Sequence, residues 1–103
     1  MTHQDYAKVF KTLSHASRLK LIELLARQGE MSVSQLTGEM PLQESTVSRH
    51  LNLLSLSGIV SARQEAQNRY YSLDPDRLQQ VFHGYLSDQL EQPAPQPAVG
   101  GSR

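Results

Sequence analysis

The spacing of apolar residues changes at Gly58, and this change limits the fold more than any other feature of the chain. Before Gly58, apolar residues recur at helical spacing. After it come two short extended segments rich in β-branched and aromatic residues, and then another helical stretch. At 103 residues the chain is long enough for one domain and too short for two. We therefore expect one mainly α-helical domain with a small β-hairpin.

Two helices are predicted in the first third of the chain. The first is indicated by a stripe at i, i+3, i+4 and i+7 made by Tyr6, Val9, Phe10 and Leu13. The second is apolar over more than one face, and we expect it to be the most buried helix. Its apolar residues are Leu19, Leu21, Ile22, Leu24 and Leu25. Gly29, which follows the basic Arg27, is expected to end it.

Two further helices are predicted before Gly58. Ser32 is expected to cap a short third helix that ends before Pro41. A fourth helix is predicted from about Glu44 to Ser57, and Gly58 follows it where a left-handed residue is needed. Its core stripe consists of Val47, Leu51 and Leu54.

The remainder is predicted to form a hairpin and a last helix. The strands are Ile59 to Glu65 and Arg69 to Leu73, joined across Ala66-Gln67-Asn68. Asp74 and Pro75 are suited to begin the helix. Its apolar residues at helical spacing are Leu78, Val81, Phe82, Tyr85, Leu86 and Leu90.

Composition sets the domain limits and excludes several classes of protein. Residues 92–103 are rich in proline and glycine, so we expect a disordered tail after a folded domain of residues 3–91. The ten basic and ten acidic residues provide no overall positive field. Cysteine is absent, which excludes disulfides and thiolate chemistry. No signal peptide or membrane segment is recognised, so a cytoplasmic protein is expected.

The short third helix, the break at Met40-Pro41-Leu42 and the polar face of the fourth helix are typical of a helix-turn-helix. A hairpin directly after it would be the wing of a winged helix. Hydroxyl, amide and guanidinium groups point away from the core stripe and suit contacts with base edges and phosphates. The residues predicted to contact DNA are Ser45, Thr46, Ser48, Arg49 and Asn52, with Arg63, Gln67 and Arg69 from the hairpin.

Four motifs resemble one known family. Residues 45–51 read Ser-Thr-Val-Ser-Arg-His-Leu, residues 57–60 read Ser-Gly-Ile-Val, and residues 69–73 read Arg-Tyr-Tyr-Ser-Leu. Together with Leu-Ser-His-Ala-Ser-Arg-Leu at residues 13–19, they resemble the ArsR/SmtB family of bacterial winged helix-turn-helix repressors. The resemblance runs from about Ala7 to Leu90. It implies a repressor that binds double-stranded DNA and whose fourth helices enter successive major grooves of a palindromic operator.

The resemblance also implies a homodimer that joins through its first and last helices. The residues placed at that interface are Tyr6, Val9, Phe10, Leu78, Val81, Phe82, Tyr85 and Leu86. On physical grounds alone, the same stripes could equally belong to the core of one protomer.

The family's metal-sensing positions are not matched. A Cys-Val-Cys segment of its third helix corresponds to Ser32-Val33-Ser34, and serine does not ionise to a thiolate. The family's last-helix metal site corresponds to Pro75, Arg77, Asp88 and Glu91, without an imidazole. No metal or cofactor is therefore expected, and the effector is unknown. A hard metal on carboxylates such as Asp88 and Glu91, or a small organic molecule between helices, stays an alternative.

Several single residues carry expectations of their own. Ala66 replaces the family's usual wing glycine, which leaves Asn68 as the only residue near the tip that readily tolerates positive φ, so a longer or differently turned wing tip is expected. His50 should pack or hydrogen-bond beside the core stripe, and His15 should cap or lie on the surface. Arg18 is expected to be a structural ion-pair partner rather than a DNA contact.

No catalytic constellation is present. The chain has no glycine-rich phosphate loop, no pair of histidines at metal-ligand spacing and no acid-base group of residues. We therefore expect a protein that is not an enzyme. A winged helix that binds another protein rather than DNA is the alternative from a different class, because the net charge is zero.

Overall fold

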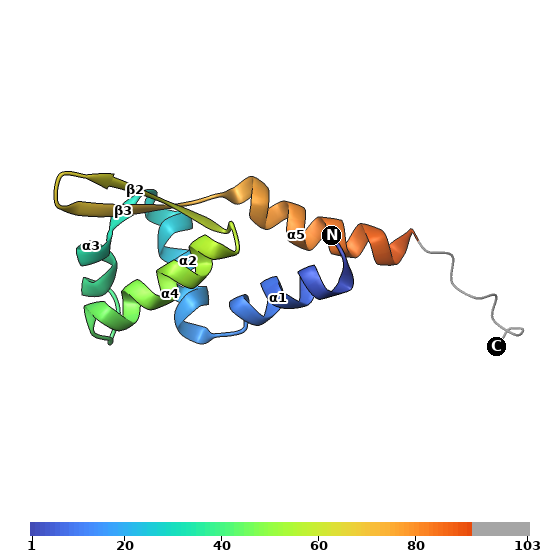
Figure 1. Ribbon diagram of the computed structural model, residues 1–103, viewed down its shortest axis with the longest axis horizontal. Helices are drawn as coiled ribbons and strands as arrows, with labels where there is room; N and C mark the ends of the chain where they lie inside the picture. The colour runs from blue at the N-terminus through green and yellow to red at the C-terminus, as the bar shows by residue number, and fades with distance from the viewer. Residues whose placement is uncertain (92–103) are drawn as a thin grey trace, which may run out of the picture.

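The computed structural model describes residues 1–91, which form five helices and a small sheet (Figure 1). The predicted class, a mainly α-helical winged helix-turn-helix, is confirmed, as is the order of four helices, a hairpin and one helix. The predicted tail, residues 92–103, lies outside the described residues. The elements are α1 (His3–Leu13), α2 (Ala16–Gln28), β1 (Met31–Ser32), α3 (Val33–Gly38), α4 (Glu44–Leu56), β2 (Val60–Glu65), β3 (Asn68–Leu73) and α5 (Pro75–Leu90).

The helix ends follow from local chemistry that the sequence already indicates. The hydroxyl of Ser32 accepts a hydrogen bond from the backbone N–H of Gln35, which begins α3. Asp74 caps α5 in the same way, and Pro75 occupies its first turn. Gly29 ends α2 with φ of 81°, and Gly58 has φ of 82° two residues after α4. The predicted caps and both glycines are confirmed.

One strand was not predicted. Met31 and Ser32 form β1, which pairs antiparallel with β3, so that Met31 lies opposite Tyr71 and Ser32 lies opposite Tyr70. The sheet order is β1-β3-β2. Two residues are too few to show the alternation that identifies a strand. The pairing joins the start of α3 to the wing.

The wing turn differs from the prediction. The ladder between β2 and β3 extends to the pair Glu65 and Asn68, so only Ala66 and Gln67 remain in the turn. Hairpins with a two-residue turn use turns of type I′ or II′. Both types require positive φ at the first of the two turn residues. Ala66 has φ of 55°, and Asn68 belongs to a strand instead. The expectation of a three-residue connection was therefore wrong, and the residue with positive φ is Ala66 rather than Asn68.

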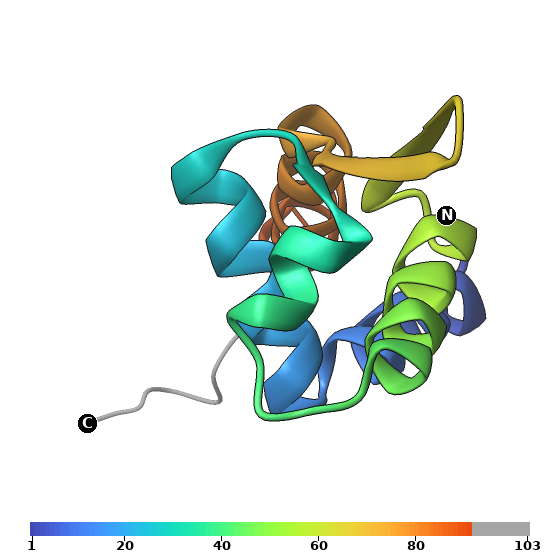
Figure 2. The ribbon, with the colours of Figure 1, turned by 90° about the vertical axis from the view of Figure 1, so that its left-hand side faces the viewer.

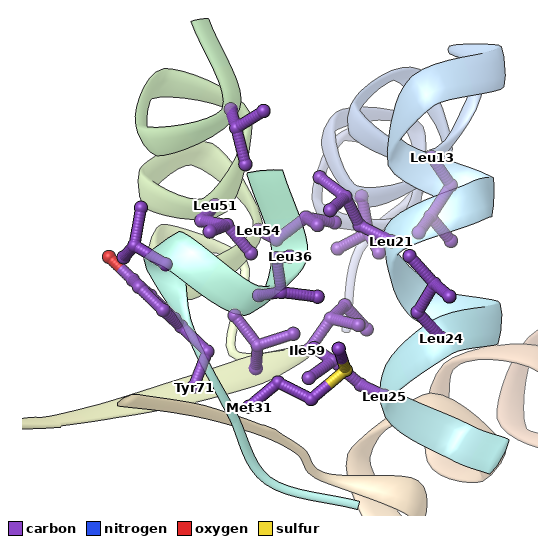
Figure 3. Packing of buried hydrophobic residues seen from close by; sticks show 14 of the residues in the cluster. Leu13, Leu21, Leu24, Leu25, Met31, Leu36, Leu51, Leu54, Ile59 and Tyr71 are labelled. Atoms are coloured by element: carbon purple, nitrogen blue, oxygen red, sulfur yellow. The ribbon is translucent and has the colours of Figure 1, made fainter. Parts of the chain in front are cut away.

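The core lies between the helices and the sheet (Figure 3). Leucines of α2, α3 and α4 meet there, together with Met31, Ile59 and Tyr71. The predicted stripe of α4 is confirmed, since Val47, Leu51 and Leu54 are fully buried. The prediction for α2 was wrong in part, because Leu19 is 54% exposed and α4 is buried at least as deeply. The face of α2 that meets the core carries Leu21, Leu24 and Leu25.

Candidate nucleic-acid interface

The outward face of α4 is polar and open to solvent. The buried stripe of Val47, Leu51 and Leu54 fixes the rotation of the helix about its axis. The side chains predicted to contact DNA therefore point away from the core. Of these, Ser45, Arg49 and Asn52 are exposed, while Thr46 and Ser48 are half-buried.

The wing turn and the start of α4 lie at the same end of the molecule as α3 (Figures 1 and 2). A hollow of about 200 Å³ separates them. It is lined by Ser32, Val33 and Ser34 from β1 and α3, by Glu44 and Ser48 from α4, and by Gln67, Asn68 and Arg69 from the wing. The structure thus brings together three of the predicted residues, Ser48, Gln67 and Arg69. Sequence reasoning did not place the start of α3 beside them, because β1 was not predicted.

The guanidinium of Arg63 is already paired with two carboxylates. Its guanidinium donates to both carboxylate oxygens of Glu30, with Nε to Oε2 at 3.0 Å, and to Glu65 Oε1 at 2.6 Å. It also lies 4.7 Å from the centroid of the Tyr70 ring. The hydrogen bonds from Arg63 lower the pKa of Glu30. The carboxylates of Glu30 and Glu65 therefore already offset the charge of Arg63. The position of Arg63 in the hairpin sequence does not reveal these partners.

Arg69 has different surroundings. Its guanidinium lies 5.6 Å from the centroid of the Tyr71 ring. No ion pair is formed by Arg69 within residues 1–91. Arg69 is therefore the wing cation that remains available to a phosphate.

His50 is buried behind the polar face, where it joins α4 to α2. Its Nδ1 accepts a hydrogen bond from Arg18 Nε at 3.1 Å, and Arg18 Nη1 donates to the carbonyl oxygen of Thr12 at 2.9 Å. This confirms the expectation that His50 packs or hydrogen-bonds beside the core stripe of α4. The expectation of an ion pair at Arg18 was wrong, because both of its partners are uncharged.

His15 lies next to this pair. Its Nδ1 accepts from the backbone N–H of Ser17 and so caps α2, which confirms the predicted cap. The centroids of the His15 and His50 rings are 4.5 Å apart. Burial lowers the pKa of His50, and electrostatic interactions with His15, Arg18 and Arg49 lower it further. His50 is therefore held neutral with its proton on Nε2, because Nδ1 is an acceptor.

This arrangement predicts a loss of stability in weak acid. Because the pKa of His50 is lower in the folded than in the unfolded state, its contribution is complete above pH 6.5 and decreases as pH falls below that value. His50→Gln retains an acceptor without titrating. Between pH 7 and 5, the free energy of unfolding of this variant should fall less steeply than that of the original chain. The two slopes should differ by at most about 1.4 kcal/mol per pH unit.

Urea unfolding at a series of pH values, at one protein concentration, measures this difference. His3→Gln removes an exposed imidazole at the start of α1 and serves as the control. Its curve should run parallel to that of the original chain. A parallel curve for His50→Gln as well would show that His50 does not couple folding to pH.

The described residues show no metal site and no membrane span. Within residues 1–91, no three side chains of His, Cys, Asp or Glu come close enough together to hold a metal ion. The Asp88 carboxylate accepts a hydrogen bond from the Tyr6 hydroxyl at 3.3 Å. None of the helices in the same range is long and apolar enough to cross a membrane.

A helix-turn-helix with a polar second helix, followed by a hairpin wing, defines the winged-helix class of DNA-binding proteins. Residues 15–62 match the family described as "Bacterial regulatory protein, arsR family". The chain belongs to the ArsR family of DNA-binding transcriptional regulators, as the sequence motifs predicted. It is accordingly a regulator and not an enzyme.

Known relatives resemble the chain over most of its length. An HTH-type transcriptional regulator of Methanocaldococcus jannaschii is 34% identical over 85% of this chain and 97% of its own. A cadmium resistance transcriptional regulatory protein, a CadC homolog of Staphylococcus aureus, is 39% identical over 84% of this chain and 72% of its own. The homodimeric winged helix-turn-helix DNA-binding domain of a Mycobacterium bovis protein has a TM-score of 0.67 and 30% identity, covering 90% of this chain and 88% of its own.

Proposed function

We propose that this protein is a homodimeric repressor that binds a palindromic operator. In each protomer, α4 enters a major groove with the residues Ser45, Thr46, Ser48, Arg49 and Asn52. Gln67 and Arg69 of the wing lie along the adjacent backbone or minor groove. The observation that carries this proposal is the exposed polar face of α4, which stands next to the wing at one end of the molecule.

The small net charge near this face favours DNA recognition through individual hydrogen bonds rather than through general electrostatic attraction. Residues 43–69 contain three arginines, of which Arg63 is already paired with Glu30 and Glu65. Arg49 and Arg69 are left to face DNA, and Glu44 stands at the start of α4. A carboxylate there repels phosphate unless it accepts from a cytosine amino group. We therefore expect a shallow salt dependence for this DNA-binding domain.

The proposed dimer surface is the face of α1 and α5 that remains apolar and exposed. Phe82 is 46% exposed and Leu86 is 53% exposed on α5. The ring of Phe10 on α1 lies 5.6 Å from that of Phe82, measured between centroids. Phe10, Leu78 and Tyr85 are half-buried. An exposed apolar patch of this kind is typical of an interface between copies.

Three of the predicted interface residues have little surface left to offer a partner. Tyr6, Val9 and Val81 are at most 6% exposed within the protomer. The reason is the close approach of α1 to α5, where a Cβ atom on Gly84 would lie 3.0 Å from the Tyr6 hydroxyl. These three residues support the interface from inside the protomer, and we propose that Phe10, Phe82 and Leu86 make the contact.

Arg49→Ala tests the DNA-binding face. The loss of a guanidinium that contacts a base or phosphate is expected to cost roughly 1–3 kcal/mol of specific binding. The operator is first selected from random duplexes, and fluorescence anisotropy then measures affinity. Arg27→Ala is the matched control, because Arg27 is an exposed arginine on α2 with only a weak 3.9 Å contact to Glu23.

Two outcomes would contradict the proposal. Equal operator affinities for Arg49→Ala and Arg27→Ala would remove Arg49 from the interface. Failure to select any duplex whose binding weakens with added salt would favour the protein-binding alternative, because release of counterions accompanies every contact with phosphate. Measured transcription from a promoter that carries the selected operator then separates repression from activation.

A further inference from the structure

A second concave surface lies at the end of α4, whereas the proposed DNA contacts of that helix lie nearer its start. It is a groove of about 660 Å³ between α1, the end of α4 and the start of α5. Ligand sites in proteins commonly have volumes of 300–1,000 Å³. Lys8 lies two residues before Phe10 on α1, which places the two side chains on opposite sides of that helix. A dimer formed through Phe10 would therefore leave the groove open.

The walls of the groove combine apolar and basic side chains. Leu53 and Leu56 of α4 provide the apolar part together with Met1 and Val9. Leu56 is 77% exposed, on a helix whose opposite face is fully buried. Neither DNA binding nor the proposed dimer explains a large apolar side chain at this position.

The basic side chains in the groove are Lys8, Lys11 and Arg77. None of the three forms an ion pair within residues 1–91. The side chain of Arg77 makes only long contacts with uncharged groups, such as Nε to the carbonyl oxygen of Ser57 at 3.4 Å. Asp5 is the acid in the lining, and its Oδ2 already accepts from the N-terminal cap at Thr2 N. The groove therefore presents a net positive charge beside an apolar wall.

We propose that this groove binds an organic anion with an apolar tail, such as a medium-chain carboxylate. The carboxylate would lie among Lys8, Lys11 and Arg77, where charge-assisted hydrogen bonds are available. The tail would cover Leu53 and Leu56 and so remove apolar surface from water. Because both leucines belong to α4, the ligand would contact the helix that also carries the polar face. Binding itself is measured without DNA, so this proposal can fail or succeed independently of the proposed function.

Decanoate is a suitable probe below the concentration at which it forms micelles. It is expected to raise the thermal unfolding midpoint of the full chain, because a ligand that binds only the folded state stabilises it. Titration calorimetry gives the dissociation constant. Acetate, which has no tail, and decyltrimethylammonium, which has the opposite charge, should not raise the midpoint at the same concentrations. An equal rise with acetate or with the cation would overturn the proposal.

Matched variants locate the site. Lys8→Gln combined with Lys11→Gln should weaken decanoate binding at least about tenfold, whereas Lys20→Gln, an exposed lysine of α2, should not. Leu56→Ala should weaken binding, whereas Leu86→Ala on the proposed dimer face should not. If Leu86→Ala removes binding while the groove variants retain it, decanoate binds the dimer face and the proposal is wrong. Circular dichroism confirms that each variant is folded.

Discussion

Replacing Phe82 and Leu86 together by glutamate is expected to convert the proposed dimer into a monomer and to weaken operator binding by on the order of 100-fold. In a two-fold dimer each substitution occurs twice on a self-complementary surface, so four new carboxylates face one another. Like charges brought together at an interface cost several kcal/mol. A monomer then contacts one half-site where the dimer contacts two.

Both side chains are suited to this test because they are largely exposed in the protomer. Phe82 is 46% exposed and Leu86 is 53% exposed, so neither substitution needs to open the core. Leu19→Glu is the matched control, because Leu19 is equally exposed at 54% but lies on α2. Sedimentation equilibrium measures the association, and fluorescence anisotropy measures operator affinity.

Each measurement can contradict a different part of the proposal. If the double variant sediments as a dimer, the interface lies elsewhere on the surface. If it is a monomer and still binds the operator with unchanged affinity, DNA recognition does not require two copies. A monomer produced by Leu19→Glu would place α2 at the interface instead.

The features that the sequence predicted correctly are those decided within a few residues of the chain. Ser32 caps the helix that follows it, and Gly58 takes the positive φ that follows α4. The buried stripe of α4 and the exposure of Arg49 follow from helical periodicity alone. Because a helix has a fixed rotation per residue, one buried stripe is sufficient to predict the opposite polar face.

The features that the sequence did not predict depend on residues far apart in the chain. Met31 and Ser32 become a strand only because β3 lies beside them. Arg63 meets Glu30, which is 33 residues away, through that same sheet. Ala66 takes positive φ because the ladder on both sides closes the turn to two residues, and this outweighs the local preference of alanine.

Contacts between distant residues also decide which apolar residues of α1 and α5 are buried in the protomer and which stay exposed for the proposed interface. Helical spacing places Val81 and Phe82 on the apolar side of α5 without saying which of them meets α1. The structure buries Val81 completely and leaves Phe82 half exposed. The outcome depends on how α5 packs against residues far away in the chain, such as Tyr6 of α1, whose hydroxyl approaches Gly84.

The largest loss of stability is expected from Leu51→Ala. Leu51 is fully buried in the stripe of α4, among leucines of α2 and α3 such as Leu21 and Leu36 (Figure 3). Its truncation removes buried methyl groups and leaves a cavity that the rigid surroundings close only in part, which costs about 2–5 kcal/mol. A domain of this size has a free energy of unfolding of roughly 5–15 kcal/mol. The variant is therefore expected to be folded at 10 °C and to unfold well below the original temperature.

Leu56→Ala provides a control on the same helix and with the same chemical change. Leu56 is 77% exposed, so its truncation should alter the free energy of unfolding by no more than about 0.5 kcal/mol. Urea unfolding at one protein concentration measures both variants, since the stability of the proposed dimer would depend on concentration. At 10 °C, Leu51→Ala should keep most of its operator affinity, because Leu51 supports α4 from inside while Arg49 faces outward. Equal stabilities for the two variants would mean that α4 is not anchored through its buried stripe, and the orientation of the polar face would then lose its physical basis.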